Sequence, residues 1–298
     1  YLYNGKVFNC LEKNQNIILK LPSIERTILV RYIDDKSINI SLKNLTNFDD
    51  IVNTDEAPDL TFERFKFNDP LYILFSSGTT GVPKCIVHGV GGTLIQHKKE
   101  HNLHCDIKEG ERVFYFSTCG WMMWNWLISG LASGATLMLY DGSPVLKNNE
   151  NILFDYADQE KFNIMGISAK FLDTCRKLEL NPMNSHNLSS LRMMLSTGSV
   201  LNSECFDYVY EKIKRSVCLS SISGGTDIVS CFVLGSNILP VYRGELQTRG
   251  LGMSVEVWDE LGSPVNGRKG ELVCTKTFPS KPVMLWDDKD MKKYSNSY

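Results

Sequence analysis

The sequence predicts an α/β protein with mostly parallel sheets flanked by helices and a small antiparallel β subdomain near the C-terminus. Between residues 71 and 221, short apolar runs alternate with stretches of helical spacing, and such alternation is typical of βαβ units. After Gly235 the pattern changes, and two strand-like runs flank a turn rich in Gly, Pro and Asn. The composition is 43% hydrophobic and 22% charged, which is ordinary for a globular domain.

The expected elements follow in chain order. The first 66 residues carry weak signals: a strand at 27–33, then a loop over 37–55, where Asn and Asp are frequent. Further strands are expected at 71–75, 85–88, 113–117, 136–140, 164–167, 191–195 and 217–221. Helices are expected at 93–104, 121–131, 169–180 and 205–214. The antiparallel pair is expected at 254–258 and 271–275.

Charge and cysteine usage exclude several classes of function. The formal net charge is -2 and no long basic run occurs, which argues against a nucleic-acid or membrane-surface partner. The nine cysteines form no C-x-x-C pair, so neither a disulfide framework nor a zinc site is expected. Cys85, Cys218, Cys231 and Cys274 lie in apolar runs and are expected to be buried thiols. With no membrane-length apolar stretch and no signal-peptide pattern, we expect a cytosolic protein.

Three predicted strands end in small hydroxyl residues and glycines. These ends are residues 117–120, 196–199 and 221–227. Ligands of parallel α/β sheets bind outside the carboxyl ends of the strands. Glycine allows a ligand to approach the backbone, and hydroxyls donate hydrogen bonds to its oxygens. One such loop would be an ordinary turn, but three together favour a site for a polar ligand.

The strongest signal is residues 76–84, which contain four hydroxyls, two glycines and Lys84. A phosphate chain binds to backbone N–H groups, O–H donors and a positive charge, and this segment supplies all three. The spacing is not that of a Walker A loop, because Pro83 stands five residues after Gly78. The alternative is a flexible Ser/Thr/Gly hairpin turn.

These motifs resemble the adenylate-forming superfamily, which includes acyl-CoA synthetases, luciferases and peptide-synthetase adenylation domains. Residues 76–84 resemble its phosphate-binding loop, 221–227 its second signature, 196–200 its adenine-binding turn and 267–272 a Gly-Glu-Leu segment of its small β subdomain. The match runs in the family's order from about 71 to 275. Longer identities, above all the tryptophan-rich residues 120–126, resemble the acetoacetate-activating branch of the acyl-CoA synthetases.

The resemblance implies an ATP-dependent acid–thiol ligase. A carboxylate attacks the α-phosphate of ATP, pyrophosphate leaves, and the thiol of CoA attacks the acyl-adenylate. The substrates would be acetoacetate, ATP and CoA, with Mg²⁺ as the metal. Two alternatives stay open: a ligase for another short- or medium-chain acid, and a non-catalytic nucleotide-binding fragment.

The resemblance also implies roles for individual residues. The catalytic set would be Thr79, Lys84, Thr226 and Asp227. The β- and γ-phosphates would contact Ser76, Ser77, Gly78, Thr79, Thr80, Gly81 and Lys84. The rest of the nucleotide would contact Gly198, Ser199, Ser221, Ile222, Ser223, Gly224, Gly225 and Thr226. Asp227 would bind Mg²⁺, directly or through water; the superfamily usually has Glu there, and an ordinary capping Asp is the alternative.

The acyl group would contact Trp121, Met123 and Gly224, although the aromatic cluster around Trp121 could equally be core packing. Acetyl-CoA synthetases place a tryptophan where this chain has Gly224. The glycine removes that wall, so a four-carbon oxo acid would fit. His97 and His101 lack the zincin glutamate and are expected to form a polar helix face, while His88 is expected to be structural.

The resemblance implies three regions: residues 1–66 as a partial first subdomain, 67–235 as the AMP-binding α/β core, and 236–298 as the small β subdomain. In the family a Gly-Asp, a hinge and a C-terminal domain with a catalytic lysine follow, and none of these is found in the 298 residues. We therefore expect little or no ligase activity from this chain alone.

Overall fold

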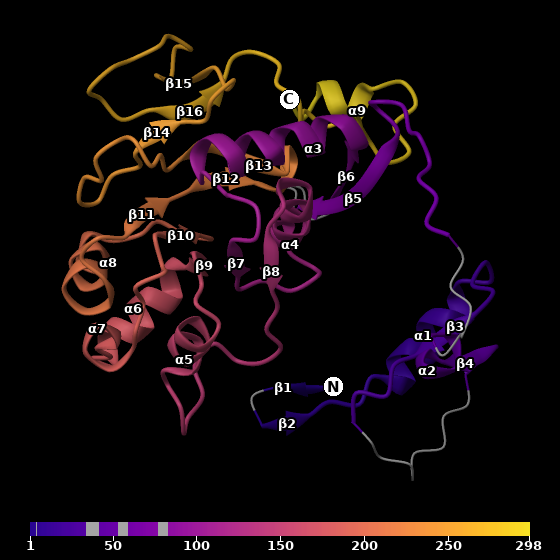
Figure 1. The fold of residues 1–298 in the computed structure, drawn as a ribbon. Helices are drawn as coiled ribbons and strands as arrows, with labels where there is room; N and C mark the ends of the chain where they lie inside the picture. The colour runs from indigo at the N-terminus through magenta and orange to yellow at the C-terminus, as the bar shows by residue number, and fades with distance from the viewer. Residues whose placement is uncertain (4, 34–41, 53–58, 77–82) are drawn as a thin grey trace. The chain divides into compact units, whose positions relative to one another are not determined.

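The computed structural model describes residues 1–298 except 4, 34–41, 53–58 and 77–82 (Figure 1). The chain divides into two units: Tyr1–Arg64 with Asp141–Leu146, and Phe65–Tyr140 with Lys147–Tyr298. The smaller unit holds an antiparallel pair, a parallel pair and two helices. These are β1 (Leu2–Tyr3), β2 (Lys6–Val7), α1 (Leu11–Lys20), β3 (Thr27–Leu29), β4 (Leu45–Asn47) and α2 (Phe48–Val52).

A five-stranded parallel sheet forms the centre of the larger unit, with the strand order β11-β10-β9-β7-β8. The strands are β7 (Arg112–Tyr115), β8 (Thr136–Met138), β9 (Ile164–Ser168), β10 (Met193–Thr197) and β11 (Cys218–Ser221). Helices flank it: α4 (Met122–Ser129), α5 (Ile152–Gln159), α6 (Ala169–Lys177), α7 (Pro182–Ser185) and α8 (Ser203–Tyr208). The predicted α/β class is confirmed.

Helices cover both faces of this sheet. On one face, Trp126 and Leu127 of α4 pack with Val113, Tyr115 and Leu195. Side chains alternate along a strand, so Phe114 points to the other face, where its ring lies 6.1 Å from that of Tyr156 in α5. Strands buried on both faces need continuous apolar runs, which explains why the sequence predicted them.

The other sheets of the larger unit are antiparallel. One sheet contains β5 (Pro70–Ser76), β6 (Lys84–Gly89) and β17 (Met284–Leu285). A second contains β12 (Ser223–Gly225), β13 (Ser230–Leu234) and β14 (Thr248–Arg249). The predicted pair near the C-terminus is present as β15 (Val255–Trp258) and β16 (Glu271–Cys274), and α9 (Lys292–Ser295) follows.

Three predicted helices end differently from the expectation. Helix α3 (Val90–Lys99) continues as a π-helical turn, Glu100–His104, and α8 continues as a second one, Val209–Ile213. A 3₁₀ turn, Gly130–Ser133, follows α4. The turn after α3 matters for the site, because it carries Glu100 into the wall of the cavity described below.

The prediction that His97 and His101 form a polar helix face is wrong. His97 and His101 have no exposed surface. His97 lies 2.9 Å from Ser129 Oγ and donates from Nε2 to the carbonyl of Val229 at 2.6 Å, so it joins α3 to the turn before β13. Helix α3 runs beside β12 and β13 in Figure 1, and Gln96 of α3 donates from Nε2 to Ser230 Oγ of β13 at 2.9 Å.

All nine cysteines are free thiols. Cys231 is buried as expected, but Cys85, Cys218 and Cys274 are only partly buried. Within the described residues, no group of three His, Cys, Asp or Glu side chains is arranged to hold a metal ion. No helix in the same part of the chain is long and apolar enough to cross a membrane.

Candidate functional site

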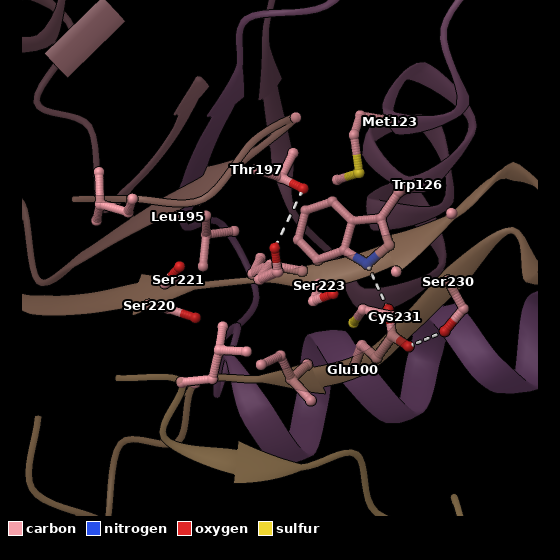
Figure 2. A pocket seen from close by; sticks show the side chains of 18 of the residues that line it. Glu100, Met123, Trp126, Leu195, Thr197, Ser220, Ser221, Ser223, Ser230 and Cys231 are labelled. Atoms are coloured by element: carbon pink, nitrogen blue, oxygen red, sulfur yellow. Dashed lines mark hydrogen bonds between the residues drawn. The ribbon is translucent and has the colours of Figure 1, made fainter. Parts of the chain in front are cut away.

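A cavity of about 620 Å³ lies where β10 and β11 end, beside the β12–β13 hairpin and helix α4 (Figure 2). Much of its polar wall comes from two of the three strand ends that the sequence singled out, 196–199 and 221–227, whereas residues 117–120 do not line it. Its apolar wall includes Met122, Met123, Met193, Leu195 and Leu234. A largely apolar hollow with a few converging polar groups is the usual form of a small-molecule site.

The loop after β10 turns sharply at Gly198, whose φ of +91° strongly favours glycine. Thr197, just before it, donates from Oγ1 to the carbonyl of Ile222 at 3.5 Å. This long hydrogen bond links the loop after β10 to the loop after β11. Two of the predicted strand ends are thus held side by side at the cavity.

The chain after β12 makes a 3₁₀ turn, Thr226–Ile228, which presents Asp227 to Lys84. Lys84 Nζ donates to Asp227 Oδ1 at 2.6 Å, and the Tyr298 hydroxyl donates to the same oxygen at 2.7 Å. Lys84 Nζ also lies 4.9 Å from the centre of the Tyr298 ring. The end of the glycine- and hydroxyl-rich segment therefore meets a turn 143 residues later in the chain.

Neighbouring charge and burial shift the pKa of Asp227 in opposite directions. Burial raises the pKa of the Asp227 carboxyl, but hydrogen bonds from Lys84 and Tyr298 lower it by more, so the net pKa is below its usual value. His88 also holds this turn in place, because its Nε2 donates to the carbonyl of Thr226 at 2.9 Å. Burial lowers the pKa of His88 to about 4, so it is neutral at pH 7, in keeping with the expected structural role.

The structure brings most of the predicted residues to one place. The cavity is lined by Trp121, Met123, Gly198, Ser199, Ser221, Ile222, Ser223, Gly224, Gly225 and Thr226. Lys84 and Asp227 pair next to Thr226, and Ser76 is the cross-strand partner of Lys84. Ser77, Gly78, Thr79, Thr80 and Gly81 lie outside the described residues. The individual roles of all these residues stay predictions.

Gly224 lines the cavity, but the space its side chain would need is occupied by the neighbouring strand. A Cβ atom at Gly224 would lie 2.2 Å from the carbonyl oxygen of Ser230 and 2.3 Å from Cys231 Cα. A Cβ at Gly225 would meet nothing within 4 Å. Gly224 therefore serves the close approach of β12 to β13, and Gly225 is the position that opens onto free space. A tryptophan at 224 would displace a strand as well as fill the cavity.

A buried polar group in the cavity wall was not predicted from the sequence. Glu100 is 1% exposed and accepts hydrogen bonds from Trp126 Nε1 at 3.0 Å and from the hydroxyl of Ser230 (Figure 2). It also accepts from Gln96 Nε2 at 3.2 Å. In the sequence Glu100 stands between Lys99 and His101, which is typical of a solvated helix face. Ser230 is 130 residues away, so no local signal identifies this group.

Comparisons with known proteins agree with this geometry. Residues 11–280 match the family model described as AMP-binding enzyme. The chain is 54% identical over 304 residues to acetoacetyl-coenzyme A synthetase of Rhizobium meliloti (strain 1021), covering 100% of the chain and 46% of that protein. It is 48% identical over 303 residues to acetoacetyl-CoA synthetase of Gallus gallus, covering 100% of the chain and 45% of that protein.

The solved structure of acetoacetyl-CoA synthetase from Streptomyces lividans superposes with a TM-score of 0.91 at 35% identity, covering 100% of this chain and 46% of that one. The chain thus spans slightly less than half the length of these relatives. The resemblance to the acetoacetate branch of the acyl-CoA synthetases is confirmed by these similarities. The chain belongs to the AMP-binding enzyme family.

Proposed function

We propose that this chain forms the nucleotide- and acid-binding part of an ATP-dependent ligase that activates acetoacetate as an acyl-adenylate and yields acetoacetyl-CoA, AMP and pyrophosphate. The names of the relatives support the substrate. The observation that carries the chemistry is the Lys84–Asp227 pair beside Thr226. It joins the 76–84 segment to the cavity, so a triphosphate and an acid can be held together.

The phosphate groups would be bound at the β5–β6 hairpin. Ser76 and Lys84 face each other across its two strands. In this proposal Lys84 contacts the β- and γ-phosphates together with Ser76, Ser77, Gly78, Thr79, Thr80 and Gly81. Thr226 donates to the α-phosphate, where negative charge builds up as the acid carboxylate attacks. Fixed donors that face this charge lower the barrier, because they need not reorganise during the reaction.

The donor set suits Mg²⁺. Mg²⁺ binds through one or two carboxylates and the substrate's phosphates and keeps several waters, so the single carboxylate of Asp227 is sufficient. The side chain of Asp227 is 32% exposed, which leaves room for water. Asp227 would hold the ion, and Lys84 would leave Asp227 for the phosphates. When bound, Mg²⁺ would neutralise charge on the leaving pyrophosphate.

The cavity would divide between adenine and the acid. Gly198 and Ser199 would pack against adenine, together with the backbone of Ser221, Ile222 and Ser223. The acyl group would lie between Trp121, Met123 and the Gly224–Gly225 strand. Both groups of residues line the same hollow. This shared lining supports a reaction in which the acid and the α-phosphate meet near Thr226.

Two measurements on the 298-residue chain test the proposal. Titration calorimetry with MgATP measures nucleotide binding, and exchange of labelled pyrophosphate into ATP measures adenylation with acetoacetate, acetate, butyrate or octanoate. We expect ATP binding that Lys84→Met weakens about tenfold or more, since a hydrogen bond to a charged group contributes about 1.5–3 kcal/mol. We expect any exchange to be weak and to be supported best by acetoacetate.

Other results favour the alternatives. Exchange supported better by butyrate or octanoate would assign a different short- or medium-chain acid. ATP binding that no acid alters, with no exchange, would favour a non-catalytic nucleotide-binding fragment. Ser236→Ala is a suitable control, because this buried serine lies outside the cavity lining and should leave both measurements unchanged.

A further inference from the structure

One side of the cavity ends in a buried hydrogen-bond network rather than in apolar side chains. It consists of Gln96, Glu100, Trp126 and Ser230, all of which are at most 4% exposed. Glu100, Trp126 and Ser230 line the cavity itself. Figure 2 shows these three side chains gathered at one end, next to Met123, with Leu195 on the other side of the hollow. An unbranched alkyl chain gains nothing from such a polar end.

The network has more donors than Glu100 needs. Oε2 of Glu100 accepts from Trp126 Nε1 at 3.0 Å, and Oε1 accepts from Gln96 Nε2, from the Ser230 hydroxyl and from Lys99 Nζ, which lies 3.5 Å away. Gln96 Nε2 also donates to Ser230 Oγ at 2.9 Å. If the Ser230 hydroxyl turned toward a ligand, both carboxylate oxygens would keep a donor and Ser230 Oγ would stay anchored by Gln96. The hydroxyl can therefore be redirected without leaving a buried group unpaired.

Strand pairing places this hydroxyl close to the expected position of the acid. Ser230 is the cross-strand partner of Gly225, which precedes Thr226. Directly opposed residues on a ladder point to the same face with about 5 Å between their Cβ positions. Since a Cβ at Gly225 would meet nothing within 4 Å, the space in front of Ser230 is open on that side. An acid with its carboxylate near Thr226 has its third carbon two bonds further along, in this space.

From this arrangement we infer that the Ser230 hydroxyl donates a hydrogen bond to the oxygen on the third carbon of a short 3-oxo acid, with Glu100 and Gln96 as positioning residues. The inference rests on the proposed function and names the group that distinguishes an oxo acid from an alkyl acid of equal length.

Other polar groups in the wall are rival donors, among them His104 and Ser220. Both ring nitrogens of His104 are engaged: Nδ1 donates to the carbonyl of Gly235 at 2.9 Å and Nε2 accepts from the N–H of Leu251 at 3.0 Å. Redirecting either bond would leave a backbone group unpaired. Ser220, on β11, is buried in the wall with no hydrogen-bond partner for its Oγ. Ser220 is thus a rival that the experiment has to separate from Ser230.

Saturation-transfer NMR on the 298-residue chain with AMP present gives the Kd values of acetoacetate and butyrate, which have equal chain lengths. We expect the wild type to prefer acetoacetate. Ser230→Ala should weaken acetoacetate binding about 3- to 10-fold, the effect of one hydrogen bond, and leave butyrate unchanged or tighter. Glu100→Gln should reduce the preference in the wild type but not further in the Ser230→Ala background, because Glu100 acts through Ser230.

Several results would overturn the inference. Equal losses for both acids in Ser230→Ala would mean a merely structural role, and a lost preference in Ser220→Ala instead would assign the other serine. In both cases the wild-type preference, and with it the proposed substrate, would stand. A wild type that binds butyrate as well as acetoacetate, or binds neither, would reject the acetoacetate proposal itself. If Ser230→Ala fails to fold, Gly225→Ala fills the same space from the opposite strand and should also reduce the preference.

Discussion

Two adjacent glycines on β12 should respond in opposite ways to the same substitution. In Gly224→Ala the new Cβ would lie 2.2 Å from the Ser230 carbonyl oxygen and 2.3 Å from Cys231 Cα. Carbon atoms pack at about 3.5–4.0 Å, so β12 has to move by more than 1 Å. Both obstacles are backbone atoms, which cannot turn away as a side chain can. Overpacking of this kind costs about 1–3 kcal/mol.

In Gly225→Ala the new methyl group enters open space, and the backbone there is extended with a φ of -175°, which any residue adopts. Replacing a compatible glycine with alanine stabilises a protein by about 0.4–1 kcal/mol, because the unfolded chain loses conformational freedom. The substitution should therefore leave stability equal or higher. It should still change ligand binding, since the methyl group occupies the cavity beside Ser230.

Differential scanning calorimetry of the two variants tests this contrast. At about 2–4 °C per kcal/mol for a domain of this size, Gly224→Ala should lower Tm by roughly 2–12 °C, and Gly225→Ala should leave it unchanged or raise it slightly. Urea unfolding at constant m-value provides an independent measurement. Equal Tm values for the two variants, or a lower Tm for Gly225→Ala, would refute the reasoning about which glycine is required by the strand contact.

Three further predictions follow from the described residues. Lys84→Met should change the free energy of unfolding, measured by urea denaturation, by less than about 1 kcal/mol. Both members of its ion pair are about 30% exposed, and such pairs contribute little to stability. A larger loss of stability would contradict this. Burial lowers the pKa of His101 to about 3, below the value of 6.5 in the unfolded chain, so the unfolded state binds the extra proton and stability should fall by roughly 3–5 kcal/mol as pH drops from 6.5 to 3. His101→Gln should make the pH-dependence of urea unfolding shallower, and an unchanged slope would reject this origin. Burial raises the pKa of the Cys175 thiol to about 12 and that of Cys105 further, whereas Cys119 is exposed. Mass spectrometry after alkylation should therefore find Cys119 labelled first. Early labelling of Cys105 in the folded chain would contradict the structure.

The parallel sheet could be predicted because each of its strands is a short apolar run in the sequence. Residues 164–167 and 191–195 are nearly free of charge, and burial on both faces requires this. The β12–β13 hairpin could not be predicted, since Gly224 and Gly225 have a low preference for strands. They pair with β13 there because the close approach of the two strands leaves no room for a side chain at Gly224. Helix α5 was not predicted from the sequence.

The candidate site was predictable where function depends on local chemistry. Glycine and hydroxyl residues at strand ends identified much of the cavity wall, because loops at that edge of a parallel sheet converge. The network around Glu100 could not be read from the sequence. Its members come from α3, α4 and β13, and each of them, taken alone, has a common structural explanation. Only the fold shows that a carboxylate and a hydroxyl close the end of the cavity.

The π-helical turn at Glu100–His104 places one more residue in the cavity wall than an α-helix of the same rotation would supply. A π-helix has more residues per turn than an α-helix, so its five residues wind about as far around the axis as roughly four α-helical residues. Removing one residue between Glu100 and His104 should therefore restore ordinary α-helical winding and leave His104 facing the same way. The length of this part of the wall should thus change by one residue without a change in α3 or in the strands that follow.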